Sequence, residues 1–345
     1  METVGCQQDQ ANRRRSARDK RTSTTGTRSA VEIHEERKED EKIVSFRRHW
    51  ENCYGKVYGC SFEDTTIVPP MCHTFELFSR NAIPDNGFQI FSIKVDQLKK
   101  EEGLQWPLQI YGLIAVRDYI DPRRNLLFHC SRDNCQTITE EDPFMLLTGP
   151  SRAVVILDPI SFEVQLKVKG QTESEDKVLV FDVFTTQHGV SYGGHYWHPP
   201  HTYTSYLRGK RSDLVFTFAV LGQSVEATIC VEVVHGSWPE ETPVRIAAST
   251  ASIPHADVVL LDSRDARVPI NDSGVIMLSR KAVSVELSGE LKVEVKVQHF
   301  GEVVKACVFA PKKSTTSCKL GITVGWSLFD PITPGTTPEQ HLPFF

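Results

Sequence analysis

The sequence predicts an all-β protein, an antiparallel β-sandwich made of two similar halves and preceded by a disordered N-terminal tail. From Phe88 onward, short stretches such as FQIFSIKV and KVLVFDVFT alternate apolar with polar residues, as half-buried strands do. Turn-forming pairs such as Asp-Pro and Ser-Gly separate these stretches at the spacing typical of a sandwich. No stretch there is long and helical enough to connect parallel strands, so we expect antiparallel sheets packed face to face.

The chain before the sandwich has a different composition. It is first basic (RRRSARDKR) and then acidic (EIHEERKEDEK), and it cannot bury enough apolar surface to offset the entropy lost on ordering. The basic stretch is either a solvated tail or a nuclear import signal. Next, Ile43, Phe46 and Trp50 have helical spacing, which predicts a short amphipathic helix and then a loop that leads into the sandwich. The predicted parts are the disordered tail 1–42, the helix and loop 43–87, the sandwich 88–330 and the C-terminal tail 331–345.

One stretch of the sandwich is written twice. It occurs as SRAVVILDPISFEVQLKVKG (151–170) and, more loosely, as SRKAVSVELSGELKVEVKV (279–297). In the second copy, apolar residues alternate with polar ones on both sides of Ser288-Gly289, which predicts a hairpin with one dry face. In the first copy the polar residues, Glu163 among them, are also expected on a solvated outer face. The repeat describes architecture, and we find in it no group able to do chemistry.

The likeness extends upstream of both copies. IYGLIAVRDYIDPRRNLLF has a looser counterpart in EATICVEVVHGSWPEETPVRIAAS, which places two similar units at about 104–185 and 222–326. Duplication and the limited vocabulary of antiparallel hairpins explain this likeness equally well. We therefore predict two halves of similar build and leave their origin open.

Composition restricts the partners and the compartment. With 39 basic and 44 acidic residues, the net charge of -5 does not favour binding to nucleic acid. No apolar stretch approaches the length of a membrane helix, and the N-terminus lacks the apolar core of a signal peptide. Nine cysteines without a C-x-x-C pair fit reduced thiols, so we expect a cytoplasmic or nuclear protein. The expected partner is a protein of unknown identity, no cofactor is expected, and the oligomeric state is left open.

A cluster of histidines is the first candidate site. QHGVSYGGHYWHPPHTYTSY reads as a long loop between strands, and imidazole is a common ligand of zinc and copper. The loop lacks a cysteine or carboxylate within its histidine set, which favours an exposed loop over a metal site. As metal ligands the candidates are His188, His195, His198 and His201. As an interaction loop, its anchors would be the aromatic residues Tyr192, Tyr196, Trp197 and Tyr203.

Carboxylates at strand ends are the second candidate site. Asp118 and Asp121, in AVRDYIDPRRN, and a second set in LLDSRDARVPINDSG stand where loops of C2-type sandwiches supply oxygens to calcium. The second set is Asp262, Asp265 and Asp272. Local ion pairing and Asx turns are the simpler interpretation, because arginines lie among these carboxylates: Arg117, Arg123, Arg124, Arg264 and Arg267. Either interpretation stays open at this point.

The order of motifs resembles a known family. FRRHWE, PPMCHTF, IYGLIAVRDYIDPRRNLLF, the repeated stretch, SVEATICVEVVHGSWPE and LLDSR together resemble a plant domain of unknown function that is abundant in grasses. The resemblance covers about residues 43–328. That family also occurs fused behind a ribosome-inactivating N-glycosidase in jasmonate-induced defence proteins of cereals, which implies a link to stress or defence. The N-glycosidase motif, a Glu and an Arg one helical turn apart, is not matched, because Glu226-Ala227 continues as Thr228-Ile229 in a predicted strand.

The usual signatures of enzymes are missing from the sequence. We find no P-loop, no G-x-G-x-x-G opening a helix, no G-x-S-x-G elbow and no H-E-x-x-H. The sequence therefore predicts a non-catalytic protein-interaction or regulatory module, with the stress link that the resemblance implies. The alternatives are a calcium- or zinc-dependent binding module of C2-like type and an enzyme of unrecognised type.

Overall fold

The structure, a computed structural model, describes residues 41–69, 83–99, 103–186, 200–234, 238, 242–264, 267–297, 303–309 and 320–329. Its strands form antiparallel sheets, which confirms the predicted all-β sandwich. Within the described ranges, no helix is both long and apolar enough to cross a membrane.

The strands that the structure describes belong to three sheets. Both halves of the sandwich use the seven-stranded sheet, called the shared sheet: β1 (Asp85–Leu98), β5 (Val154–Val155), β8 (Thr202–Arg208), β9 (Ser212–Val233), β12 (Val275–Ile276), β13 (Ala282–Glu286) and β16 (Leu320–Ser327). The first-half sheet contains β2 (Leu108–Arg117), β3 (Asn125–Cys130), β4 (Gln136–Ile138), β6 (Ile160–Val168) and β7 (Lys177–Thr186). The second-half sheet contains β10 (Val244–Thr250), β11 (Ile253–Asp262), β14 (Leu291–Val297) and β15 (Val303–Phe309).

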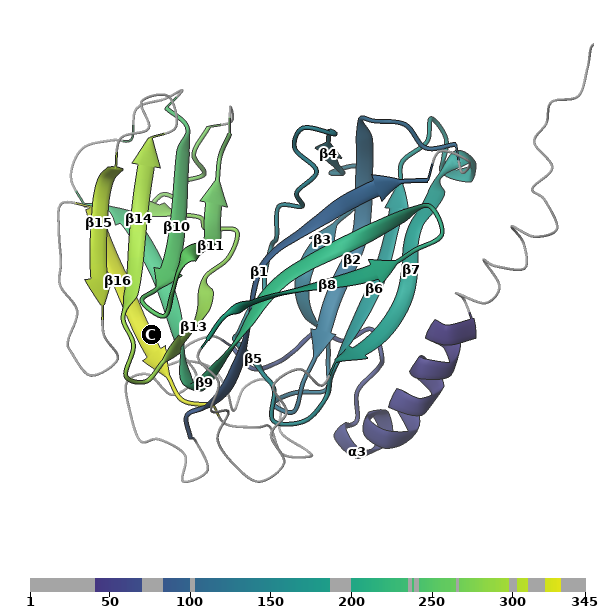
Figure 1. Ribbon diagram of the computed structural model, residues 1–345, viewed down its shortest axis with the longest axis horizontal. Helices are drawn as coiled ribbons and strands as arrows, with labels where there is room; N and C mark the ends of the chain where they lie inside the picture. Colours follow the sequence, from purple (N-terminus) through teal and green to yellow (C-terminus); the bar gives the residue numbers. More distant parts are fainter. Residues whose placement is uncertain are drawn as a thin grey trace, which may run out of the picture. The chain divides into compact units, whose positions relative to one another are not determined.

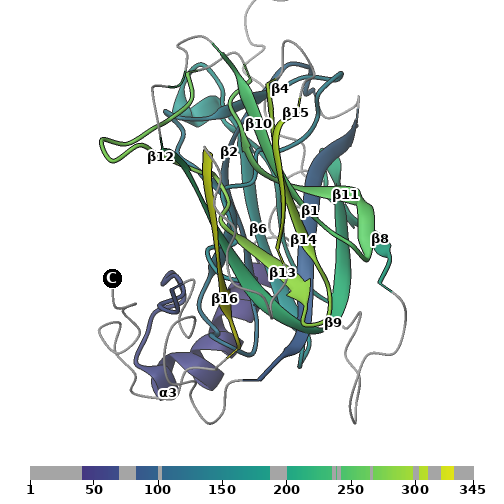
Figure 2. The same cartoon turned by 90° about the vertical axis from the view of Figure 1, so that its left-hand side faces the viewer.

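Strand β9 connects the two halves. Its N-terminal part pairs with β1 and β8, and its C-terminal part pairs with β12, β13 and β16 (Figure 1). The turned view in Figure 2 shows β9 with its neighbours β13 and β16. Phe216 and Phe218 of β9 lie in a first apolar core, whereas Ile229 and Val231 lie in a second. One continuous strand thus belongs to two cores, each closed by its own second sheet.

The predicted hairpin around Ser288-Gly289 is wrong. β13 pairs with β9 in the shared sheet, whereas β14 pairs with β10 and β15 in the second-half sheet. The connection therefore crosses from one layer to the other, and both Val285 and Leu291 lie in the second core. The alternation of apolar and polar residues correctly predicted a buried face, but alternation alone does not determine which strand lies alongside.

The first copy of the repeated stretch makes the same crossing. β5 pairs with β1 in the shared sheet, and β6 pairs with β2 and β7 in the first-half sheet. In sheet order β2 and β3 correspond to β10 and β11, because β2 adjoins β6 as β10 adjoins β14. The counterpart of IYGLIAVRDYIDPRRNLLF thus begins near Val244, and not at Glu226 as the sequence comparison suggested.

Helical structure precedes the sandwich. Residues 41–50 are α-helical and continue as the π-helical turn η1 (Glu51–Gly55) and the short helix α3 (Lys56–Tyr58). Ile43 and Trp50 are buried, as their helical spacing predicts, while Phe46 is half-buried. A 3-10 turn, η3 (Glu173–Glu175), precedes β7 and is closed by a capping box with Thr172. β1 begins at Asp85, slightly before the predicted start of the sandwich at residue 88.

Candidate functional site

Asp118 lies in the loop that follows β2, and its side chain is fully buried. It accepts two hydrogen bonds from the guanidinium of Arg152, at 2.6 Å to Oδ1 and 2.8 Å to Oδ2. Its oxygens also accept the backbone N–H groups of Asp121 and Val155. The ion pair therefore fastens the loop after β2 to the beginning of β5.

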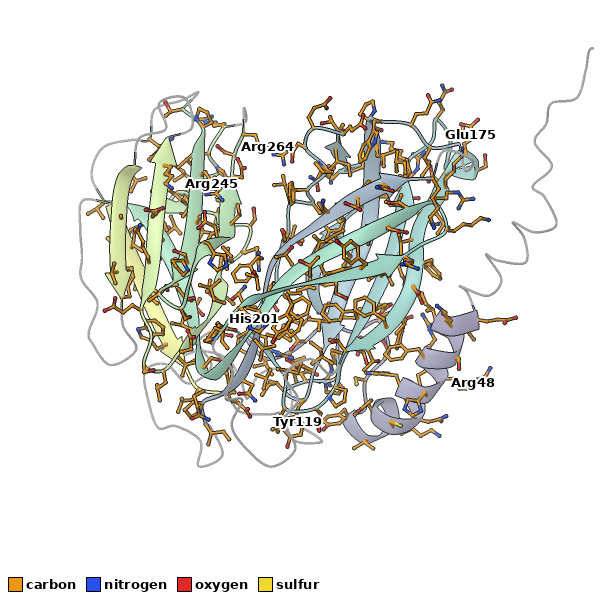
Figure 3. The ribbon with its side chains drawn as sticks, viewed as in Figure 1. Arg48, Tyr119, Glu175, His201, Arg245 and Arg264 are labelled. Atoms are coloured by element: carbon orange, nitrogen blue, oxygen red, sulfur yellow. The ribbon has the colours of Figure 1, made fainter. Side chains whose placement is uncertain are left out.

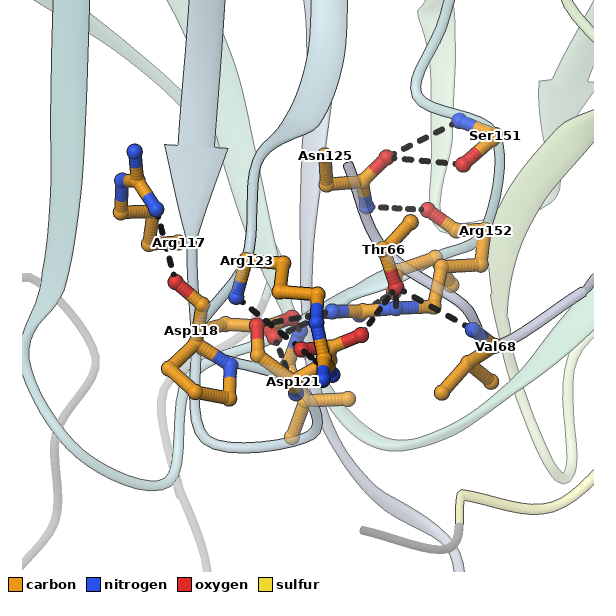
Figure 4. A network of polar contacts seen from close by, with 12 residues as sticks. Thr66, Val68, Arg117, Asp118, Asp121, Arg123, Asn125, Ser151 and Arg152 are labelled. Carbon is orange, nitrogen blue, oxygen red and sulfur yellow. Dashed lines mark hydrogen bonds and ion pairs between the residues drawn. The ribbon is translucent and has the colours of Figure 1, made fainter. Parts of the chain in front are cut away.

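Asp121 is satisfied in the same way. Its Oδ1 accepts the backbone N–H and Nη1 of Arg123, and its Oδ2 accepts the hydroxyl of Thr66 and the backbone N–H of Ile67. Each oxygen of Asp118 and Asp121 thus accepts two hydrogen bonds (Figure 4). A calcium ion at this pair would have to displace them, and the arrangement is that of local ion pairing.

Glu163 was predicted to lie on the solvated outer face of β6, but it is buried. Its side chain is 0% exposed, and it lies between Arg117 and Arg124 at 2.9 Å and 2.5 Å. Burial would raise the pKa of this carboxyl, but hydrogen bonds from Arg124 and the charges of both arginines outweigh it and hold the pKa below the ordinary value. Strand alternation placed Glu163 outward correctly, but the segment 41–68 covers that part of the sheet.

Aromatic rings complete this cluster and hold the N-terminal helix on the sandwich. The Arg117 guanidinium lies 4.2 Å from the ring centroid of Phe62 and 4.9 Å from that of Trp50. The indole N–H of Trp50 donates to the carbonyl of Pro122 at 2.8 Å. Because the charges are paired and the rings stack on them, this cluster is suited to positioning the helix.

A pocket of about 740 Å³ adjoins the cluster, between the N-terminal helix, the loop after β2 and the turn before β6. Large apolar or aromatic side chains in its wall are unusually exposed: Tyr54 by 41%, Tyr119 by 48% and Leu157 by 42%. In Figure 3, Tyr119 lies beyond the end of the sandwich, on the side of this helix. Asp85 and Asp158 also line the pocket, and neither has an ion-pair partner among the described residues.

A comparison with protein families decides where the sequence belongs. The family described as "Domain of unknown function (DUF6598)" matches residues 87–325, most of the chain. The chain belongs to the DUF6598 family. The matched region begins with β1 and ends in β16, so this DUF6598 domain comprises both halves of the sandwich. None of the curated proteins compared with it matches the sequence.

Three solved structures illustrate a distant likeness to this DUF6598 chain. A structure of extended synaptotagmin 2 with its SMP domain and two C2 domains is 8% identical with a TM-score of 0.24, and the match covers 71% of this chain and 57% of that one. The two C2 domains alone give the same identity and score and cover 74% and 94%. Human GIVD cytosolic phospholipase A2 is 7% identical with a TM-score of 0.23, covering 72% and 33%. This chain spans little more than half the length of the first of these, and likeness at this level supports no statement about ligands or activity.

The histidine loop lies largely outside the described residues of the DUF6598 chain. This applies to the predicted metal ligands His188, His195 and His198 and to the predicted anchors Tyr192, Tyr196 and Trp197. His201 is described and exposed, and its ring lies 4.1 Å from that of Tyr203. Tyr203 is half-buried in β8 and stacks on Phe218 of the first core. Among the described residues there is no group of three or more His, Cys, Asp or Glu side chains placed to hold a metal ion.

Sequence reasoning missed the pocket and most of the charge cluster. Arg152 belongs to the repeated stretch, yet nothing in its spacing marks it as buried beside Asp118. The pocket wall joins the segments 46–58, 117–122 and 157–161, which are far apart in the sequence. The one available signal was the dense run of Asp and Arg after β2, which indicated ion pairs without naming their partners.

Proposed function

We propose that this chain is a non-catalytic interaction module, and that the pocket beside the N-terminal helix binds a basic side chain of a partner polypeptide. The exposed aromatic wall of the pocket carries this proposal. Tyr54 and Tyr119 present ring surface to solvent, although burial of such rings is favourable and they are common anchors at interfaces. Their phenol groups tolerate water while their faces attract cations.

The charge of the pocket supports a cationic occupant. Asp85 and Asp158 line it without an ion-pair partner among the described residues. Burial raises the pKa of Asp85, which means that its charge is poorly solvated where it stands. An arginine or lysine of a partner would offset this cost and could stack on the tyrosine rings.

The proposed biological role is in stress or defence. It rests on the motifs that resemble the plant family, and in this role the module would bind a partner protein. The C2-like alternative, with calcium or zinc, would require a metal to raise the melting temperature of the full chain above its value in EDTA. An enzyme of unrecognised type would require a reacting group in the pocket, and there Arg117 and Asp118 are instead held in ion pairs with Glu163 and Arg152.

A peptide array tests the proposal directly. The full chain is applied to immobilised short peptides of random sequence, and the bound sequences are scored for each residue type. We expect enrichment of Arg or Lys, and at least tenfold weaker binding of these peptides by Asp158→Asn and by Tyr119→Ser. Tyr206→Ser is the matched control, because Tyr206 is 63% exposed on β8 and does not line the pocket. Binding without basic enrichment, or equal loss in the control, would overturn the assignment.

A further inference from the structure

Arg280, between β12 and β13, is a buried cation for which the described residues supply no anion. Its residue is 2% exposed, and its Nη1 and Nη2 donate to the backbone carbonyls of Phe91 and Ile90 at 3.3 Å and 2.6 Å. Among the described residues, its Nε has no hydrogen-bond partner and no carboxylate lies within 4.0 Å of the guanidinium. Burial lowers the pKa of Arg280 to about 9, in keeping with a charge that only neutral groups solvate.

Two other arginines of this chain show how a guanidinium is normally paired with a carboxylate. Arg124 donates hydrogen bonds from its Nε and Nη2 to the carboxylate of Glu163. Arg132 donates from the same two nitrogens to the carboxylate of Asp176. This edge of a guanidinium, with two parallel N–H groups, matches the two oxygens of a carboxylate. In Arg280 the same edge includes the unpartnered Nε.

The repeated stretch makes the comparison closer. Arg152 and Arg280 each follow a serine at the start of the two copies, Ser151 and Ser279. Arg152 is neutralised by Asp118, from the loop between β2 and β3. The corresponding strands β10 and β11 are joined by Ala251 and Ser252 alone, so the second half has no acidic loop at that place.

A bulge in β1 explains how Arg280 is held. The pairing of β1 with β9 shifts register between Ile90 and Ser92. At this bulge the carbonyls of Ile90 and Phe91 are available to the guanidinium, since a bulge interrupts the regular ladder. These dipoles orient Arg280 but carry no charge, so they do not neutralise it.

Arg280 lines a pocket of about 650 Å³ between β1, β11 and the segment 142–147. Phe91, Phe144 and Met145 supply apolar wall. The other arginines of the wall are already paired, Arg245 with Asp257 at 3.0 Å and Arg264 with Asp142 at 2.8 Å. In Figure 3, Arg245 and Arg264 lie on the side of the second half that faces the first.

We propose that this pocket binds a small organic carboxylate with an apolar body, whose head group is neutralised by Arg280. The pocket volume is in the range of about 300–1,000 Å³ that small-molecule sites occupy. The carboxylate would supply to Arg280 the charge that Asp118 supplies to Arg152, and the apolar body would cover Phe91 and Phe144. This site is separate from the aromatic pocket beside the helix, so the two proposals stand independently.

Titration with defined ligands tests this proposal. The full chain is titrated by calorimetry with straight-chain monocarboxylates of four to ten carbons, with their methyl esters and with the matching alkyl phosphates. We expect saturable binding of a carboxylate, at least tenfold weaker binding of its ester, and no preference for the phosphate. Arg280→Met should reduce carboxylate binding at least tenfold. Arg208→Met is the matched control and should bind as the unchanged chain does, because Arg208 is exposed on β8 and does not line the pocket.

A second variant covers the case in which Arg280→Met fails to fold. Ala256→Phe keeps Arg280 but fills part of the pocket, and it should also abolish carboxylate binding. Absence of carboxylate binding by the unchanged chain would overturn the proposal, as would binding that persists in both variants. A tenfold preference for the alkyl phosphate would overturn the carboxylate assignment.

Discussion

Asp118 and Arg152 form a buried, two-pronged ion pair that joins the loop after β2 to the start of β5, with Oδ1–Nη2 and Oδ2–Nη1 distances of 2.6 Å and 2.8 Å. The pair is also where the third, small core begins, since Ile120, Ala153 and Val155 pack there. The Asp118 carboxylate also accepts the backbone N–H of Val155. It therefore neutralises Arg152 and also provides a hydrogen-bond acceptor at the start of β5. Its removal would leave the Arg152 charge buried without compensation.

We therefore expect Asp118→Asn to lower the free energy of unfolding by about 3–5 kcal/mol, the usual cost of breaking a buried pair from one side. Asp96→Asn is the matched control, because Asp96 pairs with Lys94 at 2.9 Å with both side chains about one-third exposed. Its loss should cost less than about 1 kcal/mol. Urea unfolding monitored by tryptophan fluorescence measures both, and equal effects would contradict the structural role given to Asp118.

The buried Glu163 predicts a dependence of stability on pH. Its pKa is lowered in the folded chain, so its contribution is fully present above the pKa of the unfolded state, about 4.3. That contribution is lost as the pH falls through the lower folded pKa, because protonation then breaks the pairs with Arg117 and Arg124. Glu163→Gln should be less stable at pH 7, and its stability should fall less steeply than that of the unchanged chain below about pH 4.3.

The exposed Glu290→Gln is the control for this pH profile. It should reproduce the stability of the unchanged chain at pH 7, because Glu290 has no part in the buried cluster. The measurement is the free energy of urea unfolding at a series of pH values between 3 and 7. Parallel profiles for Glu163→Gln and the unchanged chain would show that protonation of Glu163 is not coupled to unfolding.

Substitution of two glycines with positive φ distinguishes the stability cost of backbone strain from that of a steric clash. Gly112, in β2, has a φ of 120°, and a Cβ there would lie 2.0 Å from the carbonyl oxygen of Gln165 in β6. Gly59, which ends α3, has a φ of 62° and no atom within 4 Å of such a Cβ. We expect Gly59→Ala to cost about 1 kcal/mol, from the left-handed backbone alone. Gly112→Ala should be several times more destabilising in thermal unfolding, and similar costs would contradict the close approach of β2 and β6.

Much of the fold could be predicted from the sequence because strand alternation is a local property. Val283 and Val285 were assigned to a dry face from their spacing, and both are buried in the second core. Their neighbouring strand could not be assigned, because a short turn after β13 is compatible with a hairpin and with a crossing between layers. The crossing is decided by long-range pairing of β13 with β9, which no local pattern records.

The candidate site was less predictable, for a related reason. Glu163 stands at an outward position of β6, and only the docking of Phe62 and the N-terminal helix makes that position buried. Arg280 has the same sequence context as Arg152, and the difference between them is a loop elsewhere in the chain. Burial of charges depends on contacts between distant segments, whereas the sequence shows only their types and spacing.

The register of the repeated stretch can be tested with one pair of substitutions. Val285 is 0% exposed and pairs with Val225, so Val285→Lys places a charge in the second core without a partner and should cost more than about 4 kcal/mol. Lys292, on β14, has a side chain that is 48% exposed and pairs with Glu294 at 2.6 Å. Lys292→Glu should cost less than about 1 kcal/mol, because solvent screens the repulsion from Glu294. Urea unfolding compares the two, and equal tolerance would mean that β13 does not face the core as described.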